Sequence, residues 1–104
     1  MTREERSEIA TEMTLAALRA VADATNYAIL RMLANTGASL EEIAAVTRLG
    51  RFATRERVSQ LAAGGLVTRD PQTGRVRATH LSLGLVGLIE RVKDRFAAKI
   101  EETR

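Results

Sequence analysis

The spacing of apolar residues changes from helical to alternating after Gly64 and back to helical after residue 81. This double change limits the folds that the chain can adopt. Before Gly64 the apolar residues recur at the three- and four-residue spacing of amphipathic helices. Gly64 and Gly65 end that pattern, because glycine readily takes the left-handed conformation of a helix C-terminus. Apolar and polar residues alternate over residues 66–69 and 75–81, and residues 70–74 between them hold the only proline and a glycine. The pattern predicts a β-hairpin placed between helices.

Three helices are predicted in the first part of the chain. The first spans residues 3–22, where glutamates in the opening turns favour the positive end of the helix dipole. Asp23 or Thr25 is expected to cap the second helix. Ser39 and Glu42 have the spacing of a capping box and open the third helix, because each side chain can satisfy a free backbone amide of the other.

A fourth helix precedes the hairpin and a fifth follows it. After a short connector over residues 47–50, the fourth helix spans residues 51–63. Its inward line is expected to be Thr54, Val58, Leu61 and Ala62. Ser82 is expected to cap the fifth helix, which runs to the glutamate at position 102. The sequence therefore predicts one domain over residues 1–104, mainly α with a small β-hairpin, in the order four helices, hairpin, helix.

The net charge of +3 is unevenly distributed along the chain. Residues 48–80 hold seven basic and two acidic residues, a net +5, whereas the remainder holds nine basic and eleven acidic residues, a net −2. A basic centre between mildly acidic ends is typical of nucleic-acid binding. The alternative is that scattered arginines only keep a surface soluble.

Two short helices joined by a tight turn and followed by a hairpin form the pattern of a winged helix-turn-helix. The second helix of such a pair is narrow enough to enter a DNA major groove and present its N-terminal side chains to bases. Arg51 and Arg55 are expected to donate to guanine, and Glu56 to accept from a cytosine amine. Phe52 is expected to plug the turn into the core, or otherwise to pack against a thymine methyl.

The hairpin supplies further basic residues. Arg69, Arg75 and Arg77 alternate along the predicted strands, so they are expected to share a face directed at phosphates or a minor groove. Arg48, in the turn between the two short helices, is a further candidate for a phosphate contact.

Residues 15–81 resemble the ArsR-type winged-helix repressors. Residues 18–30, Leu-Arg-Ala-Val-Ala-Asp-Ala-Thr-Asn-Tyr-Ala-Ile-Leu, are similar to the family's L-x-A-L-A-D-P-T-R-x-x-I-L segment, and the match continues through residues 40–44. Residues 58–67, Val-Ser-Gln-Leu-Ala-Ala-Gly-Gly-Leu-Val, look like the end of that family's recognition helix running into the wing.

The chain also departs from that family at several positions. Ala24 stands for the usual proline, Asn26 for an arginine and Arg57 for a histidine, and residues 51–53 replace small polar residues. Metal-sensing members use cysteines or clusters of histidines and carboxylates. This chain has no cysteine and only His80, which is expected to be a structural or surface residue, so the resemblance implies a branch that does not sense metals.

Both terminal helices carry apolar stripes longer than one small domain needs. Homodimerisation through these helices is the expectation, and the resemblance implies the same pairing. The alternative is that the last helix folds back onto its own domain. The expected interface residues are Ile9, Met13, Ala16, Leu85, Ile89, Val92, Phe96 and Ile100.

Composition excludes several other functions. Without cysteine there are no disulfides, thiolate metal ligands or thiol nucleophiles. Aromatic residues are 3% of the chain, too few for a base-stacking platform. No nucleophile–base pair, carboxylate pair or phosphate loop is evident, so we expect neither an enzyme nor a cofactor or metal. No apolar run approaches the roughly 20 residues of a membrane span, and the charged N-terminus leads into no signal-peptide core, so we expect a cytoplasmic protein without a membrane partner.

These observations predict a homodimeric regulator of transcription that binds double-stranded DNA sequence-specifically in the nucleoid. We expect a repressor that occludes a pseudo-palindromic operator, with half-sites about one helical turn apart or a multiple of it. The alternative is a winged-helix interaction module whose basic face binds an acidic protein, which Glu56 favours because it repels phosphate. Any effector is expected at the seam between the terminal helices or to act through a partner protein.

Overall fold

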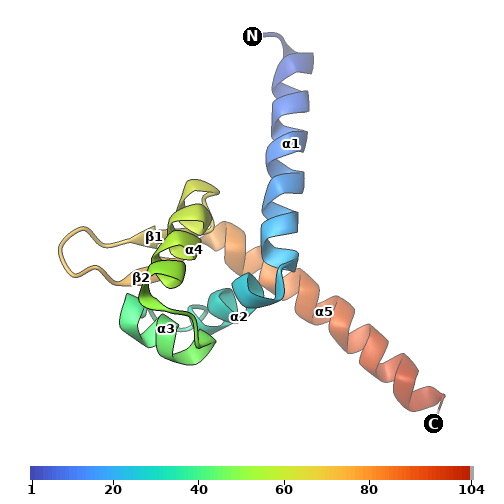
Figure 1. Ribbon diagram of the computed structural model, residues 1–104. Coiled ribbons are helices and arrows are strands. Elements are labelled where there is room, and N and C mark those ends of the chain that lie inside the picture. Colours follow the sequence, from blue (N-terminus) through green and yellow to red (C-terminus); the bar gives the residue numbers. More distant parts are fainter. Residues whose placement is uncertain (104) are drawn as a thin grey trace.

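The computed structural model describes residues 1–103 and confirms the predicted order of elements. The chain forms a winged helix-turn-helix, in which α3 and α4 are the helix pair and the antiparallel β1–β2 hairpin is the wing (Figure 1). The elements are α1 (Arg3–Ala22), α2 (Ala24–Met32), α3 (Leu40–Thr47), α4 (Arg51–Ala63), β1 (Val67–Arg69), β2 (Val76–Ala78) and α5 (His80–Glu102).

Side-chain caps begin four of the helices. Thr2 caps α1, and Asp23 rather than Thr25 caps α2 by accepting from the Asn26 amide at 3.0 Å. The predicted capping box is present at α3, where Ser39 and Glu42 accept from each other's backbone amides, both at 3.1 Å. These bonds satisfy amides that have no partner within the helix.

The start of α5 differs from the prediction. Thr79, not Ser82, is the cap, and Ser82 is fully buried in the first turn. The reason is that β2 is shorter than the alternating pattern indicated, so the helix begins three residues earlier. The Thr79 hydroxyl also donates to the Gly65 carbonyl oxygen at 2.8 Å, which ties the start of α5 to the end of α4. His80 is consequently the exposed first residue of α5 and not the end of a strand.

The core lies where the four helices α1 to α4, the hairpin and the first half of α5 meet, and α5 contributes the buried Val86. Thr54, Val58 and Leu61 are buried as predicted, but Ala62 is exposed. A bridge between Ala38 and β2 adds two backbone hydrogen bonds and fastens the loop before α3 to the wing. The largest fully buried apolar side chains are Ile29, Leu30, Ile43, Leu61, Leu66, Val21 and Val76.

The two long helices extend beyond this core. Figure 1 shows α1 and α5 leaving in different directions, with the two ends of the chain at their far tips. The Cα radius of gyration is 15.9 Å, whereas a compact chain of this length has about 13 Å. The base of α5 is held on α2 by Glu90, which accepts from the Tyr27 hydroxyl and forms ion pairs with Arg31 and Lys93.

Thr54 leads to the first prediction. Its side chain is fully buried under α4, and its hydroxyl has no hydrogen-bond partner among residues 1–103. Thr54→Val keeps the shape and removes the unpaired hydroxyl, so the free energy of unfolding in urea should rise by about 1 kcal/mol. Thr11→Val, at an exposed position in α1, is the matched control and should change stability by less than about 0.5 kcal/mol. A loss of stability in Thr54→Val would contradict the prediction.

Candidate nucleic-acid interface

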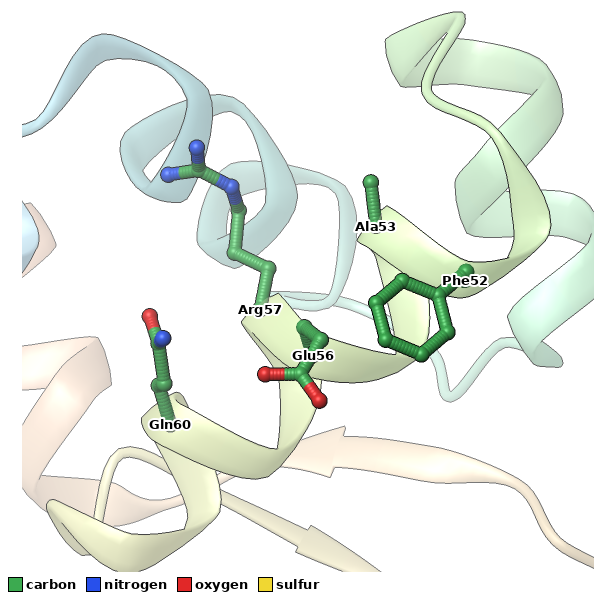
Figure 2. Close-up of a pocket in the computed structure, with 5 residues that line it drawn as sticks. All are labelled: Phe52, Ala53, Glu56, Arg57 and Gln60. Atoms are coloured by element: carbon green, nitrogen blue, oxygen red, sulfur yellow. The ribbon is translucent and has the colours of Figure 1, made fainter.

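Apart from the buried Thr54, the side chains of residues 51–56 at the start of α4 face away from the core. Phe52 is 76% exposed, so the expectation that it plugs the turn into the core is wrong. The helical period explains this, because residue 52 lies about 200° around the helix from the buried Thr54. Glu56 is one turn further along, and the Phe52 ring and Glu56 carboxylate follow each other on α4 in Figure 2.

Arg51 and Arg55 lie on another side of α4. Both are exposed, and together with α3 residues they line a shallow hollow between the two helices. Neither forms an ion pair within 4.0 Å in the part of the chain that the structure describes. The α3 residues that line this hollow are Leu40, Glu41, Ala44 and Ala45.

Arg57 turns back from the exposed face of α4. Its Nη1 atom donates to Asp23 Oδ1 at 3.0 Å and to Asn26 Oδ1 at 3.1 Å, both at the junction of α1 and α2. Sequence reasoning missed this contact, although Asn26 and Arg57 are both positions where the chain departs from the family it resembles. The sequence held one hint, namely that both positions depart from the family's pattern, but their closeness is visible only in the fold.

The wing arginines do not share one face. Residues paired across the hairpin lie on the same face. Arg69 pairs with the buried Val76, whereas Arg77 pairs with Thr68, so Arg69 and Arg77 lie on opposite faces. The prediction counted alternation within each strand, but the register across the hairpin decides the face. Arg69 Nε instead donates to the Gly74 carbonyl oxygen at 3.4 Å.

The remaining basic residues differ in how freely they face solvent. Arg75 donates to the Gly37 carbonyl oxygen and lies 3.6 Å from the Glu42 carboxylate, so it binds the start of α3. Arg77 is exposed on β2. Arg48 is exposed at the end of α3 and has a φ of 60°, a left-handed conformation that closes the helix and starts the turn.

Carboxylates near these elements are held in their charged form. The Asn26 amide, with help from Arg57, keeps the pKa of Asp23 below its usual value. The amides of Gln72 and Thr73 lower the pKa of Asp70 in the wing turn. Hydrogen bonds from Ser39 lower the pKa of Glu42.

The terminal helices carry a second exposed surface. The outer part of α5, from residue 91 to 102, is exposed throughout, so it does not fold back onto the domain. Leu85 and Ile89, nearer the start of the helix, pack partly against the core. Phe96 and Ile100 are 64% and 62% exposed. The other exposed members of the predicted stripes are Ile9, Met13, Ala16 and Val92.

An apolar groove adjoins this surface. It runs between α1, the end of α4 and the start of α5, with a volume of about 760 Å³. Apart from alanines and glycines, its lining is Met13, Thr14, Gln60, Leu66, Leu81 and Leu85. Among residues 1–103 no three histidine, cysteine or acidic side chains gather as a metal site requires. No helix in this part of the chain is both long and apolar enough to span a bilayer.

Solved structures share this fold. The homodimeric winged helix-turn-helix DNA-binding domain of Mb0332 from Mycobacterium bovis, a possible ArsR-family transcriptional regulator, is 21% identical; the match covers 93% of this chain and 91% of that domain, with a TM-score of 0.77. HlyU from Vibrio cholerae is 21% identical over 79% of this chain and 92% of its own, with a TM-score of 0.68. The transcriptional repressor BigR from Xylella fastidiosa is 20% identical over 88% and 96%, with a TM-score of 0.65. No protein-family model and no curated protein matches the sequence. At these identities the likeness shows the fold.

The lowered pKa values predict how stability depends on pH. The ordinary values are 3.8 for Asp23 and Asp70 and 4.5 for Glu42, so on acidification the unfolded chain takes up protons first. The stabilisation is therefore fully present above these ordinary values, and it is lost as pH falls from them through the lower pKa values of the folded protein. We expect the urea midpoint to fall as pH is lowered below 4.5. Asp70→Asn, which can still accept the turn hydrogen bonds, should make this fall shallower. A midpoint that rises on acidification would contradict the assignment.

Proposed function

We propose that this protein is a homodimeric regulator of transcription, ArsR-like but not metal-sensing, that binds double-stranded DNA in a sequence-specific manner. One observation carries the proposal: α4 of a winged helix-turn-helix presents an exposed N-terminal half with two arginines that have no acidic partner within 4.0 Å among the described residues. Helices in this position enter the major groove in proteins of this architecture. The DNA-binding domain of Mb0332 and the repressor BigR, which share the fold, support the same reading.

Base recognition is assigned to four side chains of α4. Arg51 and Arg55 donate to guanine O6 and N7, and Glu56 accepts from a cytosine amine. Phe52 packs against a thymine methyl, a role that its 76% exposure supports. The outermost side chains of α4 are then suited to pyrimidines, and the arginines beside α3 to guanines.

Phosphate contacts are assigned to the turn and the wing. Arg77 on β2 and Arg48 at the end of α3 are exposed and suited to this role. Arg69 lies near the wing tip, where it can also meet the DNA backbone. Arg75 serves chiefly to hold the wing against α3, because it binds Gly37 and Glu42.

We call α1 and the outer part of α5 the arms of the protein. A second copy of the chain is assigned to their exposed apolar side chains. The stripes on α1 and α5 are exposed, the groove shares Met13, Ala16 and Leu85 with them, and burying such apolar surface is favourable. The domain of Mb0332 is itself homodimeric. A two-fold dimer matches a pseudo-palindromic operator, and occupation of a promoter would repress transcription in the cytoplasm.

A second candidate function rests on the same outward face. Exposed Phe52 beside Glu56 is also suited to a protein partner, since aromatic anchors are common in protein interfaces and Glu56 repels phosphate. Binding to calf-thymus DNA at low salt separates the two functions. Retention on DNA supports the regulator, and failure to bind favours the protein-interaction module.

Substitutions on α4 and on the wing should have different effects. Arg51→Ala and Arg55→Ala should each lower affinity for a duplex selected by the wild type from a random library by about 1–3 kcal/mol. Their affinity for random duplex should change much less. Arg77→Ala should weaken binding to both duplexes by the same factor. It should also reduce the slope of log affinity against log salt concentration by about one. Fluorescence anisotropy measures all of these quantities. Wild-type behaviour of all three variants would show that the interface is wrongly assigned.

A substitution in the outer part of α5 tests the proposed dimerisation. Phe96→Glu should weaken self-association by more than about tenfold, because burying a phenylalanine contributes roughly 1.5–3 kcal/mol and a charge there is repelled. Sedimentation over a concentration series measures this change. Val46→Glu, at an exposed apolar position on α3, is the matched control and should remain dimeric. A monomeric wild type, or a dissociation constant of Phe96→Glu equal to that of the wild type, would contradict the proposed pairing.

A further inference from the structure

One polar cluster joins α4 to the junction between α1 and α2. Figure 2 shows Arg57 extending from α4 away from Glu56 and toward that junction. Its guanidinium donates to Asp23 at 3.0 Å and to Asn26 at 3.1 Å, and its side chain is 31% exposed. One arginine atom thus contacts two acceptors that lie more than 30 residues earlier in the chain.

The junction that Arg57 contacts is itself well ordered by hydrogen bonds. Asp23 caps α2 by accepting from the Asn26 amide at 3.0 Å. The Asn26 side chain donates from Nδ2 to the Ala20 carbonyl oxygen in the last turn of α1, at 2.9 Å. The cluster of Arg57, Asp23 and Asn26 therefore connects three helices, one of which is the arm α1.

Apolar packing alone leaves one motion of α4 weakly restrained. The helix rests on the core through Thr54, Val58 and Leu61, and contacts of this kind are non-directional. A small rotation about the helix axis breaks no directional bond of this buried line but moves every outward side chain. Charge-assisted hydrogen bonds are directional, and those of Arg57 act to one side of the buried line.

We propose that Arg57 is a positioning residue that sets the rotation of α4 and thereby the placement of its base-reading side chains. Glu56 precedes it directly, and Arg55 and Phe52 lie within the two preceding turns, so they move with it. The inference rests on the proposed DNA-binding function. A direct phosphate contact by Arg57 is the competing role, and the two roles predict different effects of changing Asp23.

The key variant is Asp23→Ser. Serine caps a helix about as well as aspartate, so α2 keeps its cap, but the shorter side chain does not reach Arg57. The change also removes a negative charge, which by itself would tighten DNA binding. Arg57→Gln removes the cluster from the other side, and Arg19→Gln, at an exposed position near the end of α1, is the control for loss of one positive charge.

Anisotropy titrations use the duplex that the wild type selects from a random library and a random duplex of equal length. Asp23→Ser and Arg57→Gln should each bind the selected duplex roughly tenfold more weakly than the wild type, the range for losing one base contact. Random-duplex affinity of Asp23→Ser should equal or slightly exceed that of the wild type, because a negative charge is lost, and its salt slope should be unchanged. Random-duplex affinity and salt slope of Arg57→Gln should match those of the Arg19→Gln control. Selected-duplex affinity of Asp23→Ser equal to or above the wild type would overturn the proposal. A loss of DNA affinity in Arg57→Gln but not in Asp23→Ser, with a salt slope about one lower than in the Arg19→Gln control, would also overturn it. That result would assign Arg57 to a phosphate contact.

Hydrogen exchange tests the same cluster without DNA. Backbone amides of residues 51–57 should exchange faster in Asp23→Ser than in the wild type, while those of α5 stay unchanged. Equal exchange in α4 would overturn the positioning role. If the wild type selects no sequence from the library, the proposed function fails, and the exchange rates still decide whether Arg57 restrains α4.

Discussion

The burial of one side of α4 is the contact on which the rest of the candidate interface depends. Thr54, Val58 and Leu61 enter the core, and this determines which residues of the same helix face outward. Phe52 and Glu56 are exposed because they lie opposite this line, and Arg51 and Arg55 lie beside α3 because they flank it. The wing is attached to the same core through Leu66, Val67 and Val76, so helix and wing are positioned by one set of buried side chains.

Polar contacts complete what the apolar core leaves undetermined. The capping box starts α3, Thr79 ties the start of α5 to Gly65, and Glu90 fastens the base of α5 to α2. The Arg57 cluster adds a restraint between α4 and the junction of α1 and α2. The three contacts that join different elements are directional and partly exposed, so they contribute more to the relative orientation of the helices than to stability.

The arms and the core show a division within the chain. The core buries its apolar residues within one copy, whereas the first 16 residues, including most of α1, and the outer part of α5 leave theirs in solvent. The uneven charge follows the same division, with the net positive charge on the helix pair and wing. A protein that pairs through its arms and reads DNA with its centre needs this arrangement, because one surface must favour apolar contact and the other phosphate.

Local signals in the sequence determined the order and type of the elements. The helical period, the Ser39–Glu42 capping box, the paired glycines and the turn with the only proline each act within a few residues, so they could be recognised without knowledge of the rest of the chain. The cap of α5 was misplaced because strand and helix signals overlap at residues 79–82. Only the tertiary structure decided that Phe52 faces solvent and that Arg57 contacts Asp23 and Asn26. It also decided that Arg69 and Arg77 lie on opposite faces of the hairpin. These features depend on the rotation of α4 and on the register of the hairpin, and both are set by packing between segments that are distant in sequence.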